Sequence, residues 1–258
     1  MDRAKLIELY NRDQRIQVEY PDTRKETTPT VIRQIPTSGN GDGAIIYSQL
    51  REENADEIIR QQVAYFQGLG QNFEWKLYDF DQPLDLKDRL AAHGFIIEEA
   101  EAIMVLDLQR APQVLLQPAL HDVRRIVNRE KLAHVLDVKQ KVWQDDYSWL
   151  EHYLGETITT QPDLMSVYVA YLDGQPASAA WTYFPQHSQF ASLWGGSTIR
   201  EHRNQGLYTA LLAVRLQEAV SHQVSYLTVD ASPMSQPILD KFGFERIATS
   251  YPCKWKVK

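Results

Sequence analysis

The sequence predicts a mixed α/β fold in which helices flank a mainly antiparallel sheet. An antiparallel run in the second half is the clearest evidence. Apolar residues alternate over residues 165–172, Asp173-Gly174 gives a hairpin turn, and a second strand returns over 177–184. Apolar residues at helical spacing over 54–68 and 206–220 predict long helices between strands. The 258 residues are 43% hydrophobic and 24% charged, which is ordinary for a globular protein.

The first half of the chain alternates helices and strands, separated by Pro and Gly. In order, we expect a helix over 1–20, a loop over 20–30, a strand over 31–35, a turn over 39–43, a strand over 44–50, a helix over 54–68, a strand over 73–80, a helix over 84–93 and a strand over 103–108. Pro112 and Pro118 indicate a linker over 111–118.

The second half begins with a helical segment and continues as the antiparallel run. We expect a helix over 122–156, strands over 165–172, 177–184 and 190–199, a helix over 206–220, a strand over 224–229, a helix over 236–242 and a strand over 252–257. A shift of 149 residues matches Asp81 with Asp230, Leu90 with Leu239, and Gly94-Phe95 with Gly243-Phe244. We therefore expect a tandem duplication, with one half over 1–110, the linker over 111–118 and the other half over 119–258.

Charge and cysteine content limit the partners. A net charge of −7 disfavours a general nucleic-acid binder, because phosphate backbones are bound by clustered Lys and Arg. Cys253 is the only cysteine, so neither an intrachain disulfide nor a cysteine metal cluster can form, and we expect no metal. The start of the chain is polar and no apolar run reaches about 18 residues, which predicts a soluble cytoplasmic protein. The oligomeric state stays open.

Residues 195–208 have the features of a diphosphate site. Gly195-Gly196 inside a strand predicts a bulge, which would part this strand from its neighbour and open a slot. A polar loop then leads into a helix near Gly206. The first turn of a helix offers unpaired N–H groups and a partial positive charge, and glycine lets the backbone approach a phosphate closely. The alternative interpretation is a polar loop that only caps the helix.

This segment is similar to the acyl-CoA motif of the GNAT (GCN5-related N-acetyltransferase) superfamily, Gln/Arg-x-x-Gly-x-Gly/Ala, present here as Arg203-x-x-Gly206-x-Tyr208. By element order, the resemblance covers about residues 120–258. It implies a tandem GNAT-like acyl-CoA N-acyltransferase fold, with acetyl-CoA as cosubstrate. The residues implied to bind acetyl-CoA are Thr198, Ile199, Arg203, Asn204, Gln205, Gly206, Leu207, Tyr208 and Ser235.

Two positions depart from the family pattern. Tyr208 stands where Gly or Ala is usual, so its ring either crowds the phosphates or lines the site. Leu239 stands where the family often has a tyrosine that protonates the leaving thiolate. Asp230 and Tyr208 are therefore our candidate catalytic residues, with Asp230 holding the amine or accepting its proton. A capping or turn-forming role is the alternative for Asp230, and packing is the alternative for Tyr208.

The first half lacks this chemistry at the repeated position. The 149-residue shift places Asn54–Ile59 on the loop, without a glycine and with Asp56 and Glu57, two carboxylates that would repel a diphosphate. We expect this half to keep the scaffold without the cofactor. The predicted reaction is transfer of an acetyl or other short acyl group from acetyl-CoA to a primary amine of a small molecule or peptide. A catalytically silent acyl-CoA sensor or scaffold, and a protein that binds another phosphorylated ligand, are the alternatives.

Overall fold

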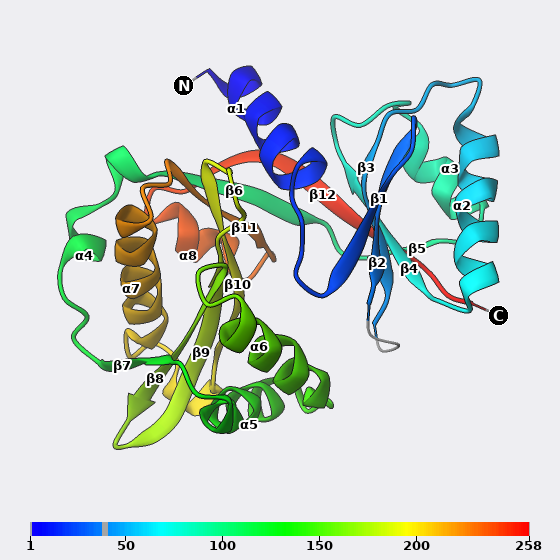
Figure 1. The fold of residues 1–258 in the computed structure, drawn as a ribbon. Helices are drawn as coiled ribbons and strands as arrows, with labels where there is room; N and C mark the ends of the chain where they lie inside the picture. The colour runs from blue at the N-terminus through cyan, green and yellow to red at the C-terminus, as the bar shows by residue number, and fades with distance from the viewer. Residues whose placement is uncertain (1, 38–40, 258) are drawn as a thin grey trace. The chain divides into compact units, whose positions relative to one another are not determined.

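The computed structural model describes residues 2–37 and 41–257, and the chain folds into two compact units (Figure 1). The first unit comprises Met1–Met104, Asp230–Ile238 and Arg246–Lys258, and the second comprises Val105–Val229 and Leu239–Glu245. The C-terminal strand therefore packs with the first unit. Division of the chain into contiguous halves at 111–118 stays a prediction about the domain boundaries.

The first unit is a sheet with helices packed on it. Its elements are α1 (Arg3–Tyr10), a π-helical turn (Asn11–Ile16), β1 (Thr23–Thr27), β2 (Val31–Pro36), β3 (Gly43–Ser48), α2 (Ala55–Leu69), β4 (Phe73–Tyr78), α3 (Leu86–Ala92), β5 (Ile96–Ile97) and most of β12 (Glu245–Trp255). β1, β2 and β3 pair antiparallel, β3 pairs parallel with β4, and β12 pairs antiparallel with β4 and β5.

Close packing of α2 on the sheet depends on one glycine and two stacked rings. Phe66 of α2 and Phe73 of β4 are both buried, and their ring centroids are 4.1 Å apart. A Cβ at Gly43 would lie 2.2 Å from the Phe66 ring. Any larger residue at the start of β3 would therefore push the helix off the strands.

The second unit has a sheet with helices on both faces. Its elements are a 3-10 turn (Leu108–Arg110), α4 (Gln113–Leu116), β7 (Asp122–Ile126), a 3-10 turn (Arg129–Lys131), α5 (Leu132–Trp143), α6 (Ser148–Thr160), β8 (Met165–Leu172), β9 (Gln175–Tyr183), β10 (Phe190–Thr198), a 3-10 turn (Arg200–His202) and α7 (Leu207–Ser221). β6 (Glu101–Asp107), β11 (Tyr226–Ala231) and α8 (Gln236–Asp240) cross the division between the units. β7 to β10 pair antiparallel in chain order, and β11 pairs parallel with β10. Figure 1 shows α7 on one side of these strands and α5 and α6 on the other, and every residue from Ala177 to Tyr183 is buried.

The order of elements repeats, as a tandem duplication predicts. Three antiparallel strands, a helix of 15 residues, a strand, a short helix and a further strand occur from β1 to β5 and again from β8 to β12. Gly94 and Gly243, with φ of 89° and 81°, follow α3 and α8. The residues before the two long helices, Asn54 and Gly206, are 152 positions apart, whereas Gly94 and Gly243 are 149 apart. The gapless shift is thus wrong by three residues at the loop.

Aligned on the helix starts, Arg203, Gly206 and Tyr208 correspond to Arg51, Asn54 and Asp56. The acidic residues Asp56 and Glu57 still fall in the first turn of α2.

The predicted fold class, mixed α/β with a mainly antiparallel sheet, is confirmed, and several bounds are corrected. Residues 20–30 contain β1, whose polar side chains suit an edge strand and gave no alternation of apolar residues. Residues 122–156 contain β7, α5 and α6 in place of one helix, because Gln144 takes a left-handed conformation (φ 56°) and ends α5. The turn expected over 39–43 lies partly outside the described residues.

Other bounds also differ from the expected ones. The first helix ends at Ile16, the linker contains α4, and β12 begins at Glu245, well before the strand expected over 252–257. The hairpin turn is confirmed: Asp173 and Gly174 have φ of 50° and 77°, as a type I′ turn requires. Among the described residues, no helix has both the length and the apolarity needed to cross a membrane.

Candidate functional site

Gly195 and Gly196 form a β-bulge in β10, as the sequence predicts. The register with β9 passes from Trp194–Trp181 directly to Ser197–Ala179. Gly195 has φ of 66°, and a Cβ there would lie 1.9 Å from the Trp181 ring. Glycine is therefore required under this indole, which fixes the position of the bulge.

β10 also leaves its other neighbour early. Its parallel ladder with β11 ends at the pair Ser192–Thr228, and no later pair exists within the described residues, although β10 continues to Thr198. The edge of β10 around the bulge is thus not paired with β11. An extended ligand is able to pair with such an edge.

The loop between β10 and α7 presents backbone amides. Asn204 and Gly206 both have left-handed conformations, with φ of 60° and 82°. Within the described part of the chain, the N–H groups of residues 204–206 donate to no backbone acceptor. Gly206 precedes α7, whose first turn contains no acidic residue. Consecutive free N–H groups at a helix N-terminus make an anion-binding concavity, so this loop suits a diphosphate.

Two side chains with nitrogen donors adjoin the loop. Arg203 is exposed, and its Nε donates to the carbonyl oxygen of Thr198 at 3.3 Å, which leaves its terminal nitrogens for a ligand. His121 Nε2 would lie 3.1 Å from a Cβ at Gly206. His121 was not among the residues predicted from sequence, because it precedes the loop by more than 80 positions.

The backbone groups of Thr198 and Ile199 are partly engaged. The Ile199 N–H donates to the Ala177 carbonyl at 3.0 Å, and its carbonyl accepts from the His202 N–H at 2.9 Å. The Thr198 hydroxyl shares a 2.8 Å hydrogen bond with that of Ser178. The carbonyl oxygens of these two residues could therefore accept hydrogen bonds from a pantetheine chain. The Ile199 N–H could not donate to it, because it already donates to Ala177.

Tyr208 lies against the bulge. A Cβ at Gly196 would be 3.5 Å from Cε2 of Tyr208, so the ring lies beside this glycine. Burial raises the pKa of Tyr208, and the opposing effect of Arg215 is smaller. The phenol is therefore protonated at neutral pH and able to donate a hydrogen bond.

Asp230 and Ser235 belong to the first unit. Asp230 forms an ion pair with Lys76, whose side chain is 18% exposed. Burial lowers the pKa of Lys76 and the Asp230 carboxylate raises it, and the pKa ends well above its usual value. Ser235 shares a hydrogen bond with Ser232 at 3.2 Å, at the start of α8. Leu239, at the position of the missing tyrosine, is fully buried.

Lys139 of α5 was not among the site residues predicted from the sequence. Its Nζ donates to the Gly195 carbonyl oxygen at 3.3 Å and to Ser197 Oγ at 3.1 Å, directly at the bulge. Burial lowers its pKa to about 8. The available signal was its spacing: Lys139 follows the buried Val135 by four residues, so it lies on the apolar stripe of the helix.

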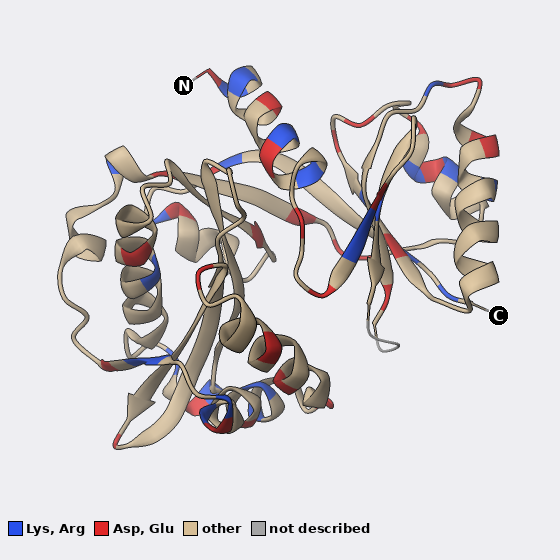
Figure 2. Ribbon diagram, viewed as in Figure 1, with Lys and Arg blue, Asp and Glu red and all other residues tan. Residues whose placement is uncertain are grey.

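In the first unit, charged side chains that bind one another surround the corresponding helix start, that of α2. Asp56, in the first turn of α2, accepts from His93 Nε2 at 2.9 Å and pairs with Arg89, both near the end of α3. The Asn54 side chain accepts from the Arg51 N–H at 2.8 Å. Figure 2 shows acidic residues at the start of α2 and in the loop before it. The chain's own carboxylates therefore occupy the start of α2.

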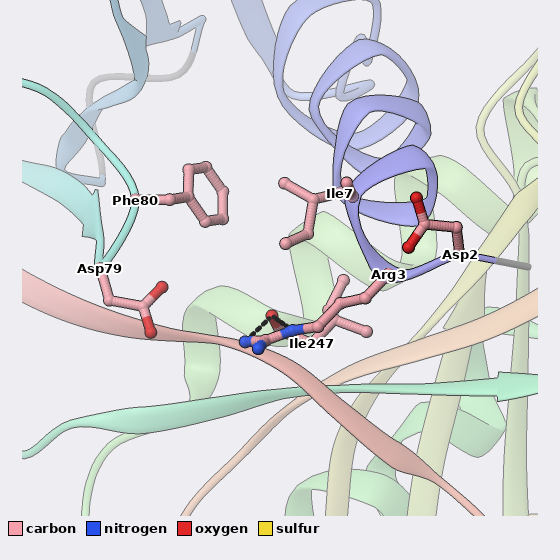
Figure 3. A pocket seen from close by; sticks show the side chains of 7 residues that line it. Asp2, Arg3, Ile7, Asp79, Phe80 and Ile247 are labelled. Carbon is pink, nitrogen blue, oxygen red and sulfur yellow. Dashed lines mark hydrogen bonds between the residues drawn. The ribbon is translucent and has the colours of Figure 1, made fainter.

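An open hollow of the first unit lies beside α1 (Figure 3). The Arg3 guanidinium that lines it already donates to the Ile247 carbonyl oxygen, from Nε at 3.1 Å and Nη2 at 2.8 Å. Asp2 and Asp79 add two carboxylates to its lining. No residue of the β10–α7 loop lines it, and its charges do not suit a diphosphate.

Residues 121–244 match the family model described as "Acetyltransferase (GNAT) family". The matched segment contains the bulge, the phosphate-type loop and α7. This part of the chain is a GNAT-family acetyltransferase domain. The family, and with it the class of acyl-CoA-dependent N-acyltransferases, is as the sequence predicted.

Solved structures share the fold over both units. A GCN5-related N-acetyltransferase from Kribbella flavida has a TM-score of 0.69 at 14% identity, over 98% of this chain and 93% of that chain. A tandem GNAT protein from the clavulanic acid biosynthesis pathway has a TM-score of 0.62 at 17% identity, over 93% and 85%. A GCN5-related N-acetyltransferase from Sphaerobacter thermophilus has a TM-score of 0.61 at 10% identity, over 89% and 77%. No curated protein sequence matches the chain.

Proposed function

We propose that the chain transfers an acetyl group from acetyl-CoA to a primary amine of a small molecule or peptide, in the cytoplasm. The observation that carries this proposal is the loop before α7. Its amides at residues 204–206 donate to no backbone acceptor of the described chain, Asn204 and Gly206 are left-handed, and no acid stands in the first turn. The diphosphate would bind these amides and those of Leu207 and Tyr208, with Arg203 beside them.

The unpaired edge of β10 is the proposed binding site for the pantetheine arm and the thioester of the cofactor. The pantetheine arm would run along the carbonyls of Thr198 and Ile199, and the thioester would reach the bulge at Gly195-Gly196. N–H groups there would stabilise the negative charge that develops on the thioester oxygen. Ser235 is proposed as a further contact with the cofactor.

The reaction needs a neutral amine held near the thioester carbon. Its nitrogen attacks, the C–S bond breaks, and the thiolate takes up a proton. Tyr208 is the proposed donor of that proton, because its phenol lies at the bulge and burial keeps it protonated. Asp230 is a proposed acceptor for the amine proton, and its carboxylate is paired with Lys76.

The first unit is proposed to bind no acyl-CoA, since Asp56 and Glu57 occupy the start of α2. Calorimetry with CoA tests this directly, and we expect one site per chain. Two equivalent sites would contradict the asymmetry.

Thiol release from acetyl-CoA, measured over a panel of amines, amino acids and peptides, tests the activity. Release that depends on one class of amine supports the proposal. CoA binding without turnover would favour a catalytically silent acyl-CoA sensor, for which the buried Leu239 is the supporting observation. A nucleotide that competes better than CoA would indicate a different phosphorylated ligand.

A further inference from the structure

Lys139 is a buried amine held against the bulge of β10. Its Nζ contacts Gly195 and Ser197, the residues on either side of Gly196, at 3.3 and 3.1 Å. The residue is 7% exposed. The amine therefore lies at the segment where the proposed function places the thioester.

Three aromatic rings surround this amine. Nζ lies 5.9 Å from the ring centroid of Trp143, 5.4 Å from that of Tyr147 and 5.3 Å from that of Trp181. The Trp143 indole N–H also donates to Ser197 Oγ at 3.1 Å, which orients the hydroxyl that accepts from Lys139. These contacts hold Nζ in one position and shield it from bulk water.

The ammonium form of Lys139 is disfavoured here. Burial lowers its pKa to about 8, and no carboxylate of the described chain opposes that effect. Tyr147 is the titratable ring among the contacts, and burial raises its pKa, so it stays neutral. At pH 8 about half of the Lys139 side chains carry a lone pair, against less than about 1% for an ordinary lysine.

We propose that Lys139 is an internal acyl acceptor, whose Nζ attacks the thioester of bound acetyl-CoA and becomes acetylated. The inference rests on the proposed function. A C–N bond forms as the C–S bond breaks, Nζ loses one proton and the CoA sulfur gains one, so the products are acetyl-lysine and free CoA thiol. An amide is stable, so this is a modification of the site and not a turnover intermediate.

Lys141 provides the matched control, because it lies on the same helix with its side chain 54% exposed and paired with Asp137 at 2.7 Å. The full chain is incubated at pH 8 with acetyl-CoA or with acetyl phosphate, which acts from bulk water, and acetylated sites are mapped by mass spectrometry. We expect acetyl-CoA to modify Lys139 at least about tenfold faster than Lys141, since bound reactants react faster than free ones. Excess CoA should suppress the acetylation of Lys139 by acetyl-CoA. Acetyl phosphate should acetylate the exposed Lys141 faster than Lys139.

Variants identify the site. Lys139→Arg should remove the CoA-suppressible acetyl group, and Lys141→Arg should not. If Lys139→Arg does not fold, the unmodified sequence still tests the proposal, because acetylation of Lys139 and Lys141 is compared with acetyl-CoA and with acetyl phosphate. Calorimetry on the same preparation separates this inference from the proposed function. CoA binding with Lys139 modified no faster than Lys141 overturns the inference alone, and absence of CoA binding overturns both.

Discussion

The two long helices, α2 and α7, begin in opposite electrostatic settings on the same scaffold. Each has 15 residues and follows an antiparallel run of strands. α7 starts after a left-handed glycine, with no acid in its first turn. α2 starts after Asn54, with Asp56 and Glu57 in its first turn and with Arg89 and His93 bound to Asp56.

This contrast shows that a helix dipole can be used in two ways. At α2 it is satisfied by the chain's own carboxylates, so the helix start stabilises the fold. At α7 the N–H groups before the helix donate to no backbone acceptor of the described chain, so the same end is available to an anion. We therefore propose that the duplicated elements differ in function through a few residues at one turn.

The largest expected effect is a loss of stability at Asp81, compared with Asp230, the residue 149 positions later that matches it in the sequence repeat. Asp81 is buried and accepts from Arg15 Nη1 and Nη2 at 2.8 and 2.7 Å. Asp81→Asn should lower the free energy of unfolding by about 3–5 kcal/mol, because it leaves the Arg15 charge buried without its partner. Urea unfolding followed by circular dichroism measures this.

Asp230→Asn is the comparison, since Asp230 and Lys76 are 20% and 18% exposed. We expect a loss of about 1–2 kcal/mol and unchanged CoA affinity. Turnover that falls about 100-fold with a changed pH profile would show that Asp230 acts on the amine. Near-normal turnover would indicate that Asp230 has only a structural role. An equal loss of stability in Asp81→Asn and Asp230→Asn would contradict the expected difference between the two carboxylates.

A glutamate at the start of either helix tests the contrast itself. Gly206→Glu should weaken CoA binding about 100-fold or more, because a Cβ would approach His121, φ of 82° disfavours a side chain, and the carboxylate repels a diphosphate. Asn54→Glu, at the equivalent position, should leave CoA affinity unchanged. Calorimetry measures both, with circular dichroism to verify folding. Unchanged affinity in a folded Gly206→Glu variant would exclude the loop as the phosphate site.

A smaller effect is expected at the two arginines three residues earlier. Arg203→Ala should weaken CoA binding about tenfold and reduce its salt dependence, since an exposed guanidinium beside a phosphate contributes about 1.4 kcal/mol. Arg51→Ala should have no effect on CoA. Equal effects of the two changes would mean that CoA also contacts the first unit.

The features predicted correctly from the sequence are those set by adjacent residues. The bulge follows from Gly195-Gly196, the hairpin from Asp173-Gly174, and the helix start from Gly206, because each depends on local backbone conformation. The polar edge strands β1 and β7 were not predicted, because edge strands lack the alternation of apolar residues.

Long-range contacts account for the remaining differences. Lys139 reaches the bulge over more than 50 positions, and Lys76 reaches Asp230 over more than 150. The C-terminal strand packs with the first unit, although it follows the second in sequence. Helical spacing places Lys139 on the buried face of α5 but does not identify the strand that it contacts, and no motif identifies the partner of Asp230.

The smallest expected effect is on the melting temperature, from the charged groups around Asp56 at the start of α2. A hydrogen bond from His93 and the ion pair with Arg89 lower the pKa of Asp56 below its usual value. A carboxyl group whose folded pKa is lowered stabilises the fold above the unfolded pKa and loses that effect as the pH falls through the folded pKa. Asp56→Asn should therefore lower the melting temperature slightly, by about 1 °C, at pH 7, and this difference should shrink as the pH falls below the ordinary carboxyl pKa of 3.8. Glu53→Gln, in the exposed turn just before α2, is the control for removal of a nearby carboxylate. A difference that stays the same size as the pH falls would mean that Asp56 acts through packing and not through its charge.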